Sequence, residues 1–191
     1  HDGLETYLIL ANEGDARAYA GYNEEASVSG LQLDPLAFPD AATLTLPQNL
    51  GRLKVKRANG SSNGGVNYQE LYSFGARSFS VRRSSGALLF DSGDQIEQIV
   101  KTALPSRFNA NHTSNSRDNR SDDKGPEPEG VITGVINGRT YAFIGLERIG
   151  GVLVYDLTEP EAPAYVQYFT SRDFNGDAEA GTAGDLAPEG L

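Results

Sequence analysis

The chain has 191 residues, a net charge of −10 at pH 7 and no Cys. A chain this acidic is a poor partner for nucleic acid, because binding a polyanion needs a basic surface that releases counterions. Without Cys, disulfides, thiolate zinc sites and thiol nucleophiles are excluded, so oxygen ligands are what remain for a metal. The 22 Gly and 9 Pro favour short strands joined by many turns, and the predicted class is all-β.

The two ends of the chain suggest a piece of a longer protein. No run of about 18 apolar residues is present, so no membrane span is predicted in this segment. The N-terminus lacks the basic and then apolar layout of a signal peptide. A strand is expected almost directly after His1, and the chain stops at Leu191 where another strand should begin. We therefore expect an internal fragment.

Strands and two short helices are predicted in the first third of the chain. Residues 6–11 form an apolar run typical of a buried strand, and residues 50–56 alternate apolar and basic side chains as a half-exposed strand does. Between them, one helix is predicted to begin at Asn23 and another to span residues 39–44. The Gly-, Ser- and Asn-rich residues 58–67 are predicted to form a mobile loop.

The middle of the chain predicts strands, a helix and a long loop. Strands joined by short turns are expected at residues 70–74, 78–82 and 87–91. Residues 94–101 carry apolar side chains on one helical face, which predicts an amphipathic helix. Residues 105–128 are polar and too long for a simple connection, so we expect this segment to be functional or disordered.

The last third has the pattern of a complete four-stranded sheet. Strands are predicted at residues 131–136, 141–146, 151–157 and 165–170. The dipeptide Asn137-Gly138 between the first two is a strong hairpin signal.

A short repeat suggests how these strands are organised. Pro-Glu-Gly occurs at residues 128–130 and again at residues 188–190. A turn with a carboxylate followed by apolar strands is the pattern of one β-propeller blade, and its recurrence marks the next blade. We therefore predict a partial β-propeller of about two and a half blades of four-stranded antiparallel sheet, with short helical insertions. The predicted division is a blade with a helical insertion at 1–67, a blade with a helix and a long polar loop at 68–126, a complete blade at 127–174, and the start of the next at 175–191.

Several segments together resemble the choice-of-anchor I family of secreted β-propellers, which includes a mesenchyme-specific cell-surface glycoprotein and phytase-like or alkaline-phosphatase-like proteins. Ser171 and Ala187 depart from the family pattern, but neither departure removes a carboxylate. The resemblance implies a full propeller whose remaining blades pair with this chain, and a secreted, periplasmic or cell-surface location. It rests on residues 11–17, 50–55, 70–80, 90–94, 120–130, 141–156 and 184–190.

Acidic turns are the strongest candidates for a binding site. Carboxylates at the starts of propeller blades converge on one axis and repel one another unless a cation joins them, and Ca²⁺ takes six to eight such oxygens. The alternative is that the glutamate of Pro-Glu-Gly only accepts backbone hydrogen bonds at a turn or pairs with Arg17, Arg120 or Arg148. The candidate metal ligands are Glu13, Asp15, Asp122, Asp123, Glu127, Glu129, Glu147, Asp185 and Glu189.

A second, weaker calcium candidate lies near the C-terminus. Asp173, Asn175 and Asp177 place oxygen side chains at alternate positions beside Gly176, like the first half of a calcium loop. The Gly and the distal Glu of a full EF-hand are missing. A solvated acidic loop is the alternative interpretation.

Two functions from different classes remain open. The first is a calcium-binding extracellular module for adhesion, matrix or mineral contact. The second is a metal-dependent phosphomonoesterase in which Arg17, Lys124 and Arg148 grip a phosphate ester beside the acidic turns. His112 is the only internal histidine and a further catalytic candidate. No Gly-x-Ser-x-Gly elbow accompanies it.

Overall fold

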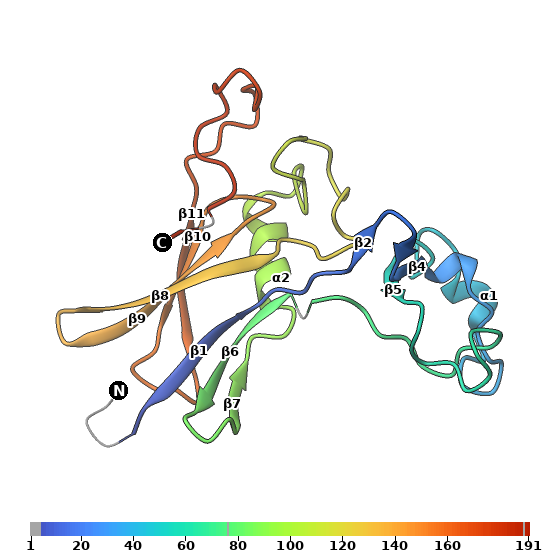
Figure 1. The fold of residues 1–191 in the computed structure, drawn as a ribbon. Coiled ribbons are helices and arrows are strands. Elements are labelled where there is room, and N and C mark those ends of the chain that lie inside the picture. Colours follow the sequence, from blue (N-terminus) through green and yellow to red (C-terminus); the bar gives the residue numbers. More distant parts are fainter. Residues whose placement is uncertain (1–4, 76, 189) are drawn as a thin grey trace. The chain divides into compact units, whose positions relative to one another are not determined.

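The computed structural model describes residues 5–75, 77–188 and 190–191, and these are mostly β-structure with antiparallel sheets and short helices (Figure 1). They form two compact units. The larger unit contains residues 5–13, 77–120 and the described residues from 125 onward, and the smaller unit contains residues 14–75 and 121–124. Each unit has its own cluster of buried side chains.

A four-stranded antiparallel sheet forms in the larger unit, as the sequence predicts. Its strands, in sheet order, are β11 (Ala164–Phe169), β10 (Val152–Asp156), β9 (Arg139–Leu146) and β8 (Pro128–Ile136). The predicted hairpin between β8 and β9 is confirmed. Asn137 and Gly138 have φ values of 53° and 78°, as expected for a two-residue turn that needs positive φ at both positions.

The second sheet of the larger unit joins distant parts of the chain. Its order is β1 (Tyr7–Asn12), β6 (Ser78–Arg83) and β7 (Leu88–Asp91), all antiparallel. The strand predicted at residues 70–74 is wrong, because there only Ser73 makes an isolated bridge. The sheet has β1 in place of the strand predicted at residues 70–74. Side chains alternate along β1, and Ile9 packs against the core that contains Val81.

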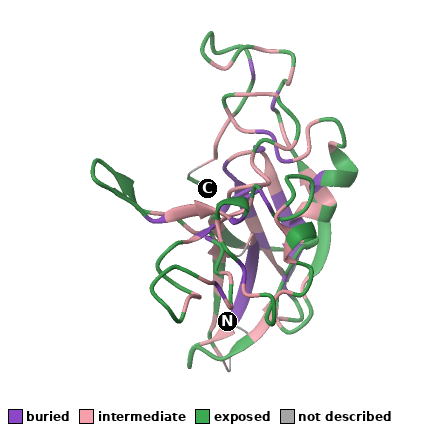
Figure 2. Ribbon diagram, turned by 90° about the vertical axis from the view of Figure 1, so that its right-hand side faces the viewer, coloured by how far each residue is buried: buried purple, intermediate pink, exposed green. Residues whose placement is uncertain are grey.

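Both sheets and one helix contribute to the larger core. Helix α2 (Gln95–Ala103) confirms the predicted amphipathic segment, and it places Ile96 in the same core as Phe79 and Ile144. The hydroxyl of Tyr155 donates a hydrogen bond to Gln95 at 3.2 Å. Figure 2 shows buried positions along the strands and exposed ones along the turns. Burying each large apolar side chain contributes about 1.5–3 kcal/mol, so this core fixes the strand ends that carry the site.

The smaller unit is built from very short elements. They are β2 (Ala18–Tyr19), β3 (Tyr22–Asn23), β4 (Glu25–Ser27), a 3₁₀ turn (Val28–Gly30), α1 (Ala41–Leu44) and β5 (Lys54–Lys56). β2 pairs with β3 and β4 with β5. Val28, Leu33, Val55 and Tyr68 form its core.

The helix predicted to begin at Asn23 is wrong, whereas the helix predicted at residues 39–44 is confirmed as α1. Tyr22–Asn23 is a strand because it pairs with β2, and Glu25–Ser27 is a strand because it pairs with β5. Glu24, between β3 and β4, is buried and forms ion pairs with Arg17 at 3.3 Å and Lys56 at 3.1 Å. Long-range pairing therefore prevails over the local helix-start signal.

The long polar segment after α2 is held in place by hydrogen bonds. In its larger-unit part, the Asn109 side chain donates to Glu97 at 2.7 Å, and the backbone N–H of Asp118 donates to the carbonyl of Phe108 at 2.7 Å. Ala110 is fully buried in the larger core. This segment is packed rather than disordered.

Candidate functional site

Three carboxylates meet at one place in the larger unit. Glu13 directly follows β1, Glu127 directly precedes β8, and Glu147 directly follows β9. One oxygen from each lies within 4.8 Å of the others. The backbone explains part of this convergence, since the N–H of Glu147 donates to the carbonyl of Glu127 at 2.9 Å. Among the described residues, this is the one acidic group with the spacing of a metal site.

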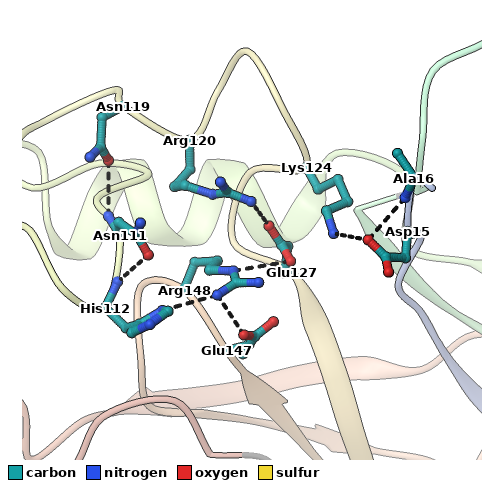
Figure 3. A network of polar contacts seen from close by, with 10 residues as sticks. All are labelled: Asp15, Ala16, Asn111, His112, Asn119, Arg120, Lys124, Glu127, Glu147 and Arg148. Carbon is teal, nitrogen blue, oxygen red and sulfur yellow. Dashed lines mark hydrogen bonds and ion pairs between the residues drawn. The ribbon is translucent and has the colours of Figure 1, made fainter. Parts of the chain in front are cut away.

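Two arginines neutralise the most buried of these carboxylates. The Glu127 side chain is fully buried, and both Arg120 and Arg148 form ion pairs with it (Figure 3). Arg148 lies 3.1 Å from Glu127 and 2.6 Å from an oxygen of Glu147. A buried carboxylate is costly unless it is paired, and Arg120 and Arg148 supply that pairing for Glu127. Arg120 and Arg148 thus pair with Glu127, which directly precedes the Pro-Glu-Gly turn, and the alternative made for the glutamate of that turn stays a prediction.

The backbone at Glu127 is also unusual. Its φ is 51°, in the left-handed region that non-glycine residues rarely adopt. Such a conformation costs about 1–3 kcal/mol and persists only where surrounding contacts hold it. At Glu127 the surrounding contacts include the ion pairs with Arg120 and Arg148.

The electrostatics of Glu147 differ from those of an ordinary surface glutamate. Burial raises the pKa of Glu147 to about 7. Arg148 opposes this rise, while the carboxylates of Glu127 and Glu129 add to it. A cation bound here would favour the charged form and lower this pKa.

His112 contacts the same network. Its Nδ1 lies 3.1 Å from the guanidinium of Arg148 (Figure 3). Burial lowers the pKa of His112, and Arg148, Arg172 and Arg120 lower it further. The ring is therefore neutral near pH 7, with Nδ1 accepting a hydrogen bond from Arg148.

A buried arginine that is not among the predicted site residues supports this site. Arg172 is 7% exposed and donates to the carbonyls of Arg148 and Ile149, both at 3.1 Å. It also donates to the carbonyl of Asn111 at 2.6 Å, and its guanidinium lies 4.4 Å from the ring centre of Phe174. Arg172 thus fixes the backbone beside Arg148 and His112. An Arg between polar residues gives no local signal of such burial.

The chemistry of the three carboxylates fits a hard divalent cation. Glu13, Glu127 and Glu147 offer oxygen ligands, which Ca²⁺ and Mg²⁺ prefer. Ca²⁺ takes six to eight oxygens, so water or backbone carbonyls would complete its shell.

The other predicted ligands that the structure describes are not members of the three-carboxylate group. Asp15 and Asp122 belong to the smaller unit, where Asp15 accepts from Lys124 at 3.3 Å and the Asp122 carbonyl accepts from the N–H of Lys54 at 2.7 Å. Asp123 is also in the smaller unit, and Glu129 is exposed.

Two predicted ligands come from the C-terminal segment. Asp185 accepts a hydrogen bond from Ser171 at 2.5 Å. Glu189 lies outside the described residues. Asp185 does not belong to the three-carboxylate group.

The C-terminal acidic loop uses its carboxylates in turns. One oxygen of Asp173 accepts from the N–H of Asn175 at 2.8 Å. One oxygen of Asp177 accepts from the N–H groups of Glu179 and Ala180 at 2.8 and 3.0 Å. These are Asx-type turns, which need no metal. The weaker calcium site at Asp173, Asn175 and Asp177 stays a prediction.

The candidate phosphate-gripping cations have carboxylate partners. Arg17 pairs with Glu24, Lys124 pairs with Asp15, and Arg148 pairs with the site glutamates. Arg17 and Lys124 belong to the smaller unit, and Arg148 belongs to the larger one.

Comparison with known proteins identifies the family. The choice-of-anchor I domain profile matches residues 2–160. The chain belongs to the choice-of-anchor I family. Within the described residues of this family member, no helix has the length and apolar character needed to cross a membrane.

Two curated relatives of this choice-of-anchor I chain are larger proteins. It is 36% identical over 112 residues to gigasin-3a of Magallana gigas, covering 56% of this chain and 39% of that protein. It is 26% identical over 117 residues to the mesenchyme-specific cell surface glycoprotein of Strongylocentrotus purpuratus, covering 53% of this chain and 15% of that protein. The match therefore spans well under half of each relative. No solved structure matches the chain.

Proposed function

We propose that this choice-of-anchor I chain is part of a secreted or cell-surface β-propeller that binds calcium through Glu13, Glu127 and Glu147 and acts in extracellular adhesion or in matrix or mineral contact. The observation that carries the calcium proposal is the convergence of these three carboxylates within 4.8 Å, from segments far apart in the chain. The relative named as a cell surface glycoprotein supports the location.

The propeller part of the proposal draws support from the sheets. The four-stranded antiparallel sheet has the size of one blade, and the β1-β6-β7 sheet would be a second blade with three strands. Of the predicted division, the complete blade at 127–174 and the start of the next at 175–191 remain part of the proposal, whereas 1–67 and 68–126 would share one blade, because β1 pairs with β6. Residues 14–75 lie between two neighbouring strands of one sheet, so they would form an insertion within that blade. The remaining blades would come from other parts of the protein.

Calcium titration tests the proposal. For the wild-type chain, we expect a calcium-dependent rise in melting temperature, because a ligand present at 100 times its Kd stabilises the folded state by about 2.7 kcal/mol. Glu13→Gln and Glu147→Gln should weaken calcium binding about tenfold or more, since each removes a carboxylate ligand. Glu127→Gln is less informative, because it leaves Arg120 and Arg148 without their shared carboxylate.

Glu159→Gln is the matched control, because Glu159 is exposed and lies outside the three-carboxylate group. It should bind calcium as the wild type does. Absence of calcium binding in the wild type, or equal binding in the Glu13 and Glu147 variants, would contradict the proposed site. Turnover of p-nitrophenyl phosphate that a chelator abolishes would replace the adhesive role with the phosphomonoesterase.

A further inference from the structure

A pocket lies entirely within the smaller unit, and the calcium proposal does not use it. Its volume is about 550 Å³. We call it the tyrosine pocket, and the residues of its lining that matter here are Tyr22, Asn23, Arg57, Ser61, Gly64 and Tyr68.

Two exposed tyrosines form an aromatic pair, and one of them, Tyr22, lines this pocket. Tyr19 and Tyr22 are paired across the β2–β3 hairpin and are 64% and 39% exposed. Their ring centres are 5.5 Å apart and their planes are tilted by 31°. Exposed tyrosine rings supply a large, rigid contact area at low entropic cost, which is why they are frequent in binding surfaces.

Two side chains of the pocket, Arg57 and Asn23, have donor groups available for a ligand. Arg57 donates to the backbone carbonyl of Glu25 at 3.0 Å, and within the described part of the chain no carboxylate pairs with its guanidinium. The Asn23 oxygen accepts from the N–H of Glu25 at 2.8 Å, which leaves the amide NH₂ for a ligand. The Glu24 carboxylate is already paired with Arg17 and Lys56.

The loop that forms one wall of the pocket is organised in advance. Ser61 accepts from the N–H of Gly65 at 2.9 Å, and Asn63 accepts from the N–H of Asn67 at 2.8 Å. The N–H of Ser62 donates to the Gln69 side chain at 3.0 Å. A loop held by its own hydrogen bonds loses less entropy when a ligand binds.

We propose that the tyrosine pocket binds an acidic carbohydrate. The apolar C–H face of a pyranose ring would pack against Tyr22 and Tyr19, and the sugar carboxylate would accept charge-assisted hydrogen bonds from Arg57. Ring hydroxyls would accept from the Asn23 amide and from the backbone N–H of Gly64. A guanidinium without a carboxylate partner, among other donors, favours an anionic ligand with many acceptors. The aromatic surface favours one with a flat apolar face.

The test uses oligomers of galacturonic acid as the probe, with uncharged galactose oligomers of the same length for comparison, measured by calorimetry in the presence of chelator. The wild-type chain should bind the acidic oligomer and bind the neutral one about tenfold or more weakly, because a hydrogen bond to a charged group contributes about 1.5–3 kcal/mol. Tyr22→Ala and Arg57→Gln should each reduce binding of the acidic oligomer by about tenfold or more.

Two matched variants control for general effects. Tyr72→Ala removes another exposed tyrosine of the smaller unit, outside the pocket lining. Arg82→Gln removes an arginine that, like Arg57, donates to one backbone carbonyl, that of Gly86. Both should bind the acidic oligomer like the wild type. Equal binding of the neutral oligomer, full binding by Arg57→Gln, or no binding by the wild type would each overturn the proposal. The carbohydrate test contains chelator and leaves Glu13 and Glu147 unchanged. Absence of carbohydrate binding would therefore not contradict the calcium proposal, and absence of calcium binding would not contradict the carbohydrate proposal.

Discussion

At the scale of single residues, environment gives two glutamates opposite acidities. Burial raises the pKa of Glu147 to about 7. A side-chain hydrogen bond from Arg17 lowers the pKa of Glu24 to about 2, and the Arg17 backbone and Lys56 contribute to the same shift. The sequence predicts Glu147 as a site residue from its place after a strand, but it assigns Glu24 only a helix-start role. Ion-pair partners brought together by the fold decide the difference.

Glu24 should contribute to stability in a pH-dependent way. Because its folded pKa is lowered from the ordinary 4.5, the contribution is present above pH 4.5 and is lost as the pH falls toward about 2. Glu24→Gln should be less stable at pH 7 and should lack this part of the acid dependence. Melting of the wild type and the variant between about pH 2 and pH 7 measures the effect, with Glu25→Gln as the neighbouring control. Parallel pH profiles for Glu24→Gln and the wild type would contradict the assignment.

At the scale of elements, local patterns predict hairpins and helices whose partners are close in the chain. The β8–β9 hairpin follows from Asn137-Gly138, and α2 follows from its apolar face. The strand β1 is predicted correctly, but its pairing with β6 is not, because residues 14–75 intervene and no local pattern records that partner. For the same reason, residues 22–27 form strands instead of a helix.

The turn between β8 and β9 should be sensitive to substitution through its backbone alone. Gly138 has a φ of +78°, and a Cβ added at this position would meet nothing within 4 Å, so a side chain would make no steric clash there. Gly138→Val should nevertheless destabilise the larger unit by about 1–2 kcal/mol, because a left-handed conformation is unfavourable for L-residues. Chemical denaturation measures this change.

Gly134→Ala in β8 is the control for that substitution. A Cβ at Gly134 would meet only the Phe143 ring at 3.6 Å, which is ordinary contact. Gly134→Ala should therefore change the free energy of unfolding much less than Gly138→Val does. Equal costs would show that the turn conformation is not the cause.

At the scale of the whole molecule, the chain has two cores, and each should respond to its own substitutions. Ile144 is fully buried in the larger core, whereas Val55 is buried in the smaller one. The sequence predicts enough apolar residues for a folded protein but does not divide them into two clusters. That division follows from which strands pair and from the insertion of residues 14–75 between β1 and β6.

Truncating a core residue should therefore act within one unit. Ile144→Ala should cost about 2–5 kcal/mol, because it removes buried methyl groups and leaves a cavity. Hydrogen exchange should show faster exchange in β8, β9 and β10, and protection of the amides around Val55 should be unchanged. The control is Leu36→Ala, because the Leu36 side chain is 92% exposed. It should change amide exchange neither in β8, β9 and β10 nor around Val55. Equal loss of protection around Val55 and Ile144 would mean that the two cores unfold as one.

The sequence by itself determines the β-rich class, the four strands from β8 to β11, helix α2 and the acidic turns, because these depend on turn chemistry and side-chain periodicity between near neighbours. It also carries the family resemblance. Only the tertiary structure decides that Glu13, Glu127 and Glu147 converge, that two arginines share the buried Glu127, and that β1 pairs with β6. These features join segments far apart in the chain, and the free energy that selects them comes from burial and pairing across the fold, which no local pattern encodes.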